Sequence, residues 1–122
     1  MVRILVAEDE PDIQTLIQRR LHREGYELLF ADNGDEALRL AIAERPDLIV
    51  LDWMMPGLTG IDVCVALRAQ AEVSATKVLM LTARAQESDL QAAFDAGIDE
   101  YLIKPFRSTE LQERVAALLA RR

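Results

Sequence analysis

The sequence predicts an α/β domain: a doubly wound, five-stranded parallel sheet with strand order 2-1-3-4-5 and helices on both faces. Segments with strand character alternate five times with segments of helical periodicity along the 122 residues, a pattern typical of parallel sheets. The first and third strand segments are apolar runs, as expected for strands covered on both faces. The five glycines and four prolines fall where the periodicity changes. Because crossovers between parallel strands are right-handed, few other topologies remain.

Strands and helices follow one another with short connections. Short apolar runs bounded by turn residues indicate the strands. The expected strands are residues 2–7, 26–31, 47–51, 78–81 and 101–103. Apolar residues that recur with the 3.6-residue period indicate the helices. The expected helices are residues 11–24, the segment from Asn33-Gly34 to Pro46, residues 60–70, residues 88–96, and a last helix that runs to the end of the sequence.

Glycines and hydroxyl side chains mark the helix ends. Gly25 is expected to close the first helix and Gly97 the fourth, because glycine readily adopts the left-handed conformation found there. Either Ser108 or Thr109 is expected to cap the last helix. In the third helix we expect Ile61, Cys64, Val65 and Arg68 to lie along one side, and in the fourth we expect Leu90 and Phe94 in the core.

Composition indicates one domain, residues 1–122, of a cytoplasmic protein. The net charge of −7 opposes binding to nucleic-acid phosphates. No apolar run is long enough to span a membrane, and the apolar start of the chain is broken at once by acidic residues, unlike a signal peptide. A single cysteine, Cys64, excludes an internal disulfide. We therefore expect no membrane partner and no direct nucleic-acid partner.

Polar residues follow four of the strands at the edge where ligands bind in such sheets. Glu8 and Asp9 follow the first strand, Asp52 ends the third, Thr82 ends the fourth, and Lys104 follows the fifth. The first and third strands are neighbours in the expected order, so their carboxylates should converge. The sequence therefore predicts one polar site at this edge.

Clustered carboxylates repel one another, so either their pKa values rise or a cation neutralises them. Oxygen ligands favour Mg²⁺ over zinc, and the single histidine, His22, lies in the first helix, remote from the site. Taken alone, residues 8–10 would read as a solvated acidic loop that suits the helix dipole. Asp52 and Lys104 at the matching strand ends favour a metal site instead.

The remaining groups suggest phosphoryl transfer. Lys104 and the Thr82 hydroxyl could hold the oxygens of a transferring phosphoryl group together with the metal ion. Asp52 would then be the nucleophile and form an acyl phosphate.

Four motifs resemble the receiver domains of two-component response regulators. These are EDE at residues 8–10, LDWMMPGLTG at 51–60, LTA at 81–83 and KPF at 104–106. They occur in family order and spacing over nearly the whole chain. The resemblance implies a flavodoxin-like fold of the kind found in chemotaxis regulators.

The resemblance also implies roles for single residues. Asp52 would accept a phosphoryl group from a phosphohistidine on a sensor histidine kinase or a phosphotransfer protein. Asp9 would bind Mg²⁺ directly, with Mn²⁺ as an alternative ion, Glu8 would bind through water, and the main-chain carbonyl of Met54 would be a further ligand. The side chains of Trp53, Met54 and Met55 are expected to pack.

Such a domain is a switch that assists its own phosphorylation and dephosphorylation, and it is not a turnover enzyme. By the resemblance, Thr82 and Tyr101 rearrange together, the Lys104–Pro105 peptide is cis, and Arg84 beside the pocket tunes dephosphorylation. The surface of the fourth helix, fifth strand and fifth helix would then control an output domain or a partner protein.

Some family members form homodimers through this surface by means of acidic and basic pairs. The residues that could supply such charges here are Asp99, Glu100, Glu110 and Arg114. However, no basic residue stands near Leu90, where that type of dimer has one, and a solvated charged face is the alternative.

Three other functions fit this sequence less well. A flavin-binding module would need a phosphate-cradling loop after the first strand, where this chain has acidic residues. An aspartate-nucleophile phosphatase would need a second aspartate two residues after the nucleophile and a lid. A receiver that takes no phosphate would lack part of the motif, and nothing is missing here.

Overall fold

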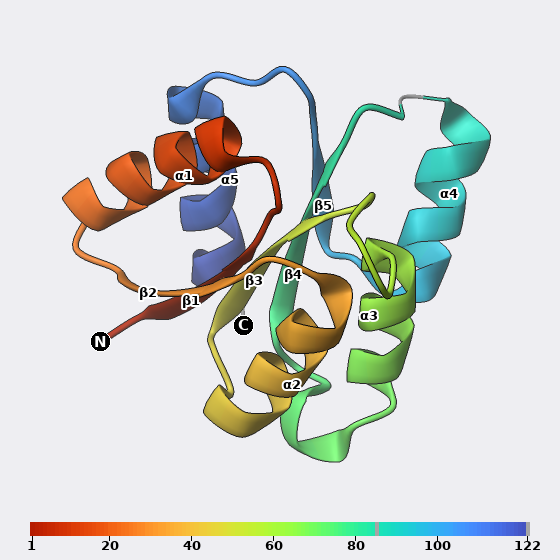
Figure 1. Cartoon of the computed structure of the whole chain (residues 1–122). Helices are drawn as coiled ribbons and strands as arrows, with labels where there is room; N and C mark the ends of the chain where they lie inside the picture. The colour runs from red at the N-terminus through yellow and green to blue at the C-terminus, as the bar shows by residue number, and fades with distance from the viewer. Residues whose placement is uncertain (85, 122) are drawn as a thin grey trace.

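The computed structural model describes residues 1–84 and 86–121. Its five strands form a parallel sheet in the order β2-β1-β3-β4-β5, which confirms the predicted topology (Figure 1). The strands are β1 (Arg3–Ala7), β2 (Glu27–Ala31), β3 (Leu48–Asp52), β4 (Lys77–Thr82) and β5 (Glu100–Ile103). All five residues of β3 are buried, because the strand lies between β1 and β4 and is covered on both faces.

Helices cover both faces of the sheet, α1 and α5 on one and α2, α3 and α4 on the other (Figure 1). The helices are α1 (Pro11–Arg23), α2 (Gly34–Glu44), α3 (Gly60–Arg68), α4 (Glu87–Ala96) and α5 (Ser108–Ala120), with a short 3₁₀ turn, η1, at Ala71–Val73. Successive strand residues alternate between the two cores, so that Ile4 packs with α1 and α5 while Leu5 packs with α2 and α3. No helix within residues 1–84 or 86–121 is long and apolar enough to cross a bilayer.

Two predicted helix faces were wrong. In α3, Val65 is 54% exposed, whereas Val63, Cys64 and Leu67 are buried. Apolar residues occupy most of α3, so its sequence does not define one inward face. In α4, Phe94 is 40% exposed, and its ring packs edge-on against Tyr101 with centroids 5.9 Å apart.

The predicted cap of α5 was also wrong. The helix begins at Ser108, so neither Ser108 nor Thr109 precedes it, and Arg107 holds the capping position. The Glu110 carboxylate reaches back and accepts a hydrogen bond from the Arg107 backbone N–H at 3.0 Å. A carboxylate at the third helical position thus pairs with a backbone N–H at the start of the helix. By contrast, α2 has a side-chain cap, since the Asn33 side chain accepts a hydrogen bond from the Glu36 N–H at 2.8 Å.

Arg68 at the end of α3 ties down the edge of the sheet opposite the predicted site. Its guanidinium donates five hydrogen bonds: two to the Gly97 carbonyl, one each to the Ser74 and Thr76 carbonyls, and one to Asp99. Asp99 also accepts from the backbone N–H at the start of β4 at 2.7 Å. One side chain therefore joins α3, the loop before β4 and the end of α4.

We expect Arg68→Ala to lower the free energy of unfolding by about 2–3 kcal/mol, because charged hydrogen bonds to partly buried acceptors are lost. Urea denaturation measures this as a lower midpoint at an unchanged slope. Arg39→Ala, at an exposed position on α2, is the matched control and should change stability by less than about 0.5 kcal/mol. Equal effects of the two substitutions would contradict the structural role of Arg68.

Candidate functional site

Side chains from β1, β3 and β5 meet at the carboxyl edge of the sheet. The Lys104 ammonium lies 3.2 Å from Glu8 Oε1 and 3.2 Å from Asp52 Oδ1. The sequence predicted this convergence of Glu8, Asp52 and Lys104. The convergence follows from the strand order, because β1 and β3 are neighbours. The chain places β2 on one side of this pair and then β4 and β5 on the other, which leaves the site between the two halves of the sheet.

The acidic member that joins Glu8 and Asp52 is Glu10. Carboxylate oxygens of these three residues all lie within 4.8 Å of one another, and Lys104 is also 3.4 Å from Glu10. Asp9, which the sequence prediction placed in the cluster, is exposed and outside this group. Side chains alternate along an extended chain, so Glu8 and Glu10 share one side and Asp9 takes the other. The expected role of Asp9 stays a prediction.

Glu8 is the member of the cluster whose charged form burial disfavours most. Its side chain is fully buried, and its Oε2 has no hydrogen-bond partner within residues 1–84 and 86–121. Burial, with the nearby Asp52 carboxylate, raises the pKa of Glu8 from an ordinary value of 4.5 to about 8, although Lys104 partly opposes this. Burial lowers the pKa of Lys104, but Asp52 and Glu8 more than offset it, so this pKa is raised and Lys104 stays an ammonium.

These residues fit a divalent cation. Three carboxylates face one ammonium, and a buried carboxylate oxygen is left without a partner. The cluster offers only oxygen ligands, which suits Mg²⁺ and does not suit zinc. A cation of charge 2+ would neutralise the excess negative charge and satisfy the free oxygen.

The loop after β3 shapes the mouth of the site. Trp53 and Met55 are each 8% exposed and pack as expected, but the Met54 side chain is 58% exposed, so its predicted packing was wrong. Gly60 N–H donates to the Trp53 carbonyl at 2.8 Å. A Cβ on Gly60 would lie 2.5 Å from the Asp52 carbonyl oxygen, so glycine permits this close approach of α3 to β3.

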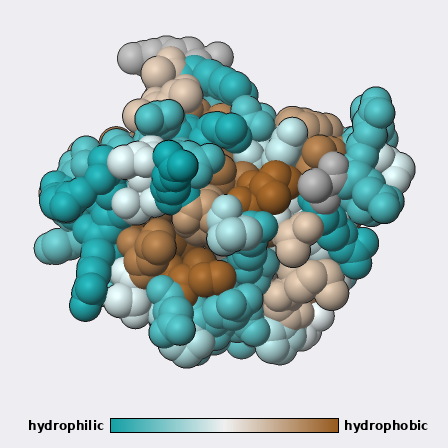
Figure 2. Space-filling model, turned by 90° about the horizontal axis from the view of Figure 1, so that it is seen from above, coloured by the Kyte–Doolittle hydropathy of each residue, from teal (hydrophilic) through white to brown (hydrophobic). Residues whose placement is uncertain are grey.

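The pocket that opens beside Asp52 has a volume of about 230 Å³. Its lining residues are Glu10, Asp52, Trp53, Met54, Thr82, Ala83, Arg84 and Lys104. Thr82 Oγ1 accepts from the Arg84 backbone N–H at 2.8 Å, and the Arg84 guanidinium lies 5.0 Å from the centre of the Trp53 ring. The Lys104–Pro105 peptide is cis, as the resemblance implied. Figure 2, which views the molecule from above relative to Figure 1, shows apolar patches surrounded by a hydrophilic surface.

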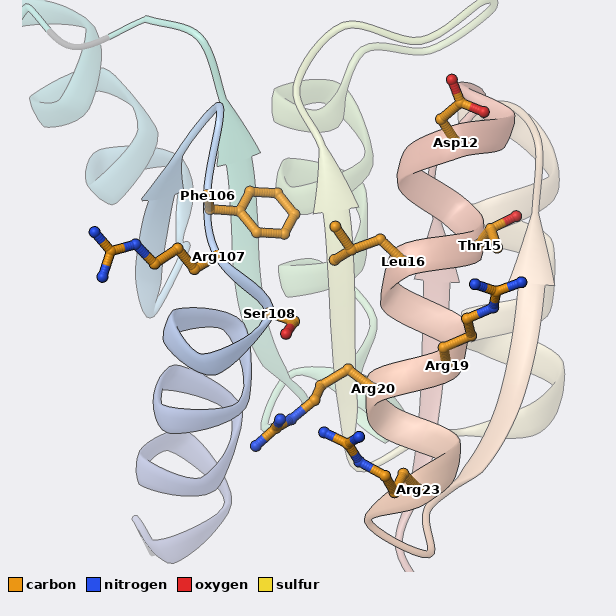
Figure 3. Close-up of a pocket in the computed structure, with 9 residues that line it drawn as sticks. All are labelled: Asp12, Thr15, Leu16, Arg19, Arg20, Arg23, Phe106, Arg107 and Ser108. Carbon is orange, nitrogen blue, oxygen red and sulfur yellow. The ribbon is translucent and has the colours of Figure 1, made fainter.

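A larger hollow of about 420 Å³ lies between α1 and the start of α5 and has a different character (Figure 3). Phe106 and Leu16 face each other across it, and Arg20 and Arg23 extend toward α5 below them. Its arginine-rich lining, which includes Arg19, repels a cation. The carboxylate chemistry therefore belongs to the smaller pocket.

Fold and pocket together define a class of protein: a flavodoxin-like α/β domain with an acidic, lysine-containing site where the winding of the sheet reverses. Residues 4–116 match the family model described as the response regulator receiver domain. The chain belongs to this family, whose members are the receiver domains of two-component systems.

Known proteins agree with this assignment. The chain is 47% identical over 119 residues to the alkaline phosphatase synthesis transcriptional regulatory protein PhoP of Bacillus subtilis, covering 98% of this chain and 49% of that protein. The chain spans about half the length of the curated relatives it matches.

Two solved structures share the fold over 98% of each chain. One is a putative response regulator from Chloroflexus aurantiacus, with a TM-score of 0.92 and 34% identity. The other is the receiver domain of the sensor histidine kinase PA1611 from Pseudomonas aeruginosa, with a TM-score of 0.90 and 33% identity. The latter was solved with a magnesium ion coordinated in its active-site cleft.

We expect Glu8 to destabilise the metal-free protein as the pH rises. In the folded protein Glu8 keeps its proton up to about pH 8, whereas the unfolded chain loses it near pH 4.5. The stability that this proton contributes is therefore present below pH 4.5 and is lost as the pH rises to about 8. Relative to wild type, Glu8→Gln should therefore gain stability as the pH is raised from 5 to 8 in a chelator. Urea denaturation at several pH values measures the difference. Glu113→Gln, at an exposed position on α5, is the control, and a pH-independent difference for Glu8→Gln would contradict the prediction.

Proposed function

We propose that this domain works in phosphorelay signalling, with Asp52 as the acceptor of a phosphoryl group from a phosphohistidine. The donor would be a sensor histidine kinase or a phosphotransfer protein. The single observation that carries the proposal is the contact between Lys104 and the buried Asp52 at the mouth of the pocket, in a chain of the receiver family.

The reaction needs one nucleophile and good charge compensation. An Asp52 carboxylate oxygen attacks phosphorus, a P–O bond forms, the P–N bond breaks, and its electron pair stays on the imidazole nitrogen. Lys104 already lies at hydrogen-bond distance from Asp52, so it can move onto a phosphoryl oxygen with a small rotation. The Thr82 hydroxyl, which now points its O–H toward the Arg84 carbonyl at 3.4 Å, would donate instead to a second phosphoryl oxygen.

Bound Mg²⁺, or Mn²⁺, would neutralise charge that develops on the phosphoryl oxygens. We propose as its ligands Asp52, Asp9 and the Met54 main-chain carbonyl, with Glu8 through water. The magnesium in the cleft of the PA1611 receiver supports the choice of ion. Glu10 is the alternative to Asp9 as a metal ligand, because Glu10 is the residue that joins the carboxylate cluster here.

The output of the phosphorylation would be a switch and not turnover of a substrate. Thr82 moves toward the phosphoryl group, and Tyr101, now half-buried against Phe94, moves with it. The α4–β5–α5 surface would then contact an output domain or a partner protein. Relatives about twice as long are named transcriptional regulators, which supports an output domain in the same protein. A homodimer on phosphorylation is a further proposal, and the Arg114–Glu100 pair at 3.8 Å lies on that surface.

With Mg²⁺ and acetyl phosphate, we expect the protein to gain the mass of one phosphoryl group and Trp53 fluorescence to change, because Trp53 adjoins Asp52. Asp52→Asn should gain no mass, and a chelator should prevent the reaction. Asp32→Asn is the matched control, since Asp32 follows β2 at the same edge of the sheet, and should react normally. An unsubstituted protein that takes no phosphoryl group would overturn the proposal.

The metal ligands can be distinguished by Mg²⁺ titration of Trp53 fluorescence. We expect Asp9→Asn to weaken Mg²⁺ binding by about tenfold or more, because a direct ligand is lost, and Glu10→Gln to weaken it by less than about threefold. The reverse ranking would assign the third carboxylate ligand to Glu10.

A further inference from the structure

We propose that Arg84 latches the first turn of α4 to the Asp52 pocket, and that a phosphoryl group on Asp52 opens this latch by drawing the guanidinium away from Asp89. The proposal concerns regulation of the site described above and rests on the proposed function. It assigns Arg84 a positioning role that links the chemistry to one end of one helix.

Arg84 contacts three residues that belong to two parts of the molecule. Its guanidinium lies over the Trp53 ring at 5.0 Å and within 3.9 Å of the Met54 sulfur, both in the loop after Asp52. It also lies 3.7 Å from an oxygen of Asp89, in the first turn of α4. Arg84 therefore bridges the β3–α3 loop and the start of α4 across the mouth of the pocket.

The two ends of α4 are held very differently. At its C-terminal end, the Gly97 carbonyl receives two of the five hydrogen bonds of Arg68, and Ala93 is buried. At its N-terminal end, Gln86 provides no side-chain cap, and Glu87 and Ser88 are exposed. Within the part of the chain that the structure describes, the Arg84–Asp89 pair is the ion pair at this end. Loss of that pair frees the first turn and leaves the far end fixed.

A phosphoryl group would compete for the same guanidinium. Arg84 and Asp52 line one pocket, so the guanidinium lies near the place where phosphoryl oxygens would project. Arginine binds phosphate through two parallel hydrogen bonds, whereas its present partner Asp89 is 3.7 Å away and the pair is exposed to screening. The dianionic group is the stronger partner.

The Arg84 backbone supports the same transition. Its N–H is held by Thr82 Oγ1 at 2.8 Å, and the carbonyl of Arg84 lies 3.4 Å from the same hydroxyl. When Thr82 turns to a phosphoryl oxygen, it must release this backbone contact. Both the side chain and the main chain of Arg84 therefore lose their present partners in the same step.

Hydrogen exchange of the amides in residues 87–91 tests the latch. In the unphosphorylated protein, Arg84→Ala and Asp89→Asn should each speed exchange there by about two- to fivefold, as expected for loss of one exposed ion pair. Acetyl phosphate with Mg²⁺ should speed exchange similarly in wild type and add little in either variant. Glu87→Gln removes a first-turn charge without touching Arg84 and should behave as wild type, which separates the latch from a helix-dipole effect.

Trp53 fluorescence gives a second readout that a general loss of helix stability would not move. Arg84→Ala and Arg84→Lys should shift the emission, because the planar guanidinium leaves the ring, while Asp89→Asn should leave it unchanged.

Mass spectrometry of the same samples separates this proposal from the proposed function. If wild type gains no phosphoryl mass, the proposed function fails, and opening of the latch by phosphorylation fails with it. If the mass is gained but exchange in residues 87–91 is unchanged, or if both variants exchange as wild type before phosphorylation, the latch is overturned while the proposed function stands.

Discussion

The site depends on charge compensation between buried carboxylates and one lysine. Glu8 and Asp52 sit almost out of solvent at adjacent strand ends, where like charges in a low dielectric repel strongly. Lys104 offsets part of that repulsion from the end of β5, which is two strands from β3 and three from β1, and its ammonium lies 3.2 Å from each carboxylate. The compensation is incomplete, since Glu8 keeps a raised pKa and an unpartnered oxygen among the residues described. The pocket thus has an electrostatic preference for a cation.

The sheet brings these charges together and also fixes the distances between them. β1 and β3 pair in register, so that Ala7 lies opposite Leu51 and the next residues of both strands emerge side by side. β4 stands between β3 and β5, and the Lys104 N–H continues the ladder by donating to the Thr82 carbonyl at 2.8 Å. Lys104 must therefore reach past the end of β4 to meet Asp52, and its long flexible side chain allows it to do so.

Sequence patterns predicted what depends on local composition and on the rules of parallel sheets. The alternation of strand and helix segments, with the rules for parallel sheets, predicted the strand order. The polar residues at the strand ends predicted that Glu8, Asp52 and Lys104 lie in one site. What escaped prediction depends on contacts between distant segments. Whether Asp9 or Glu10 turns inward depends on how far the extended backbone continues after β1, which the run of three acidic residues does not reveal. The stacking of Arg84 on Trp53 likewise has no local signal.

The unequal attachment of α4 explains how a local change of charge could reach a distant surface. An added phosphoryl group supplies new interactions only within a few ångströms of Asp52, so a rigid scaffold would absorb them without moving. Here the pocket and α4 share Arg84 at one end of the helix, whereas Arg68 fixes the other end through two hydrogen bonds to the Gly97 carbonyl. Motion would therefore concentrate in the first turn of α4, whereas Phe94 lies near the fixed end and keeps its edge-on contact with Tyr101. The weak exposed ion pair suits this role, because a contact worth several kcal/mol could not be exchanged by one phosphorylation.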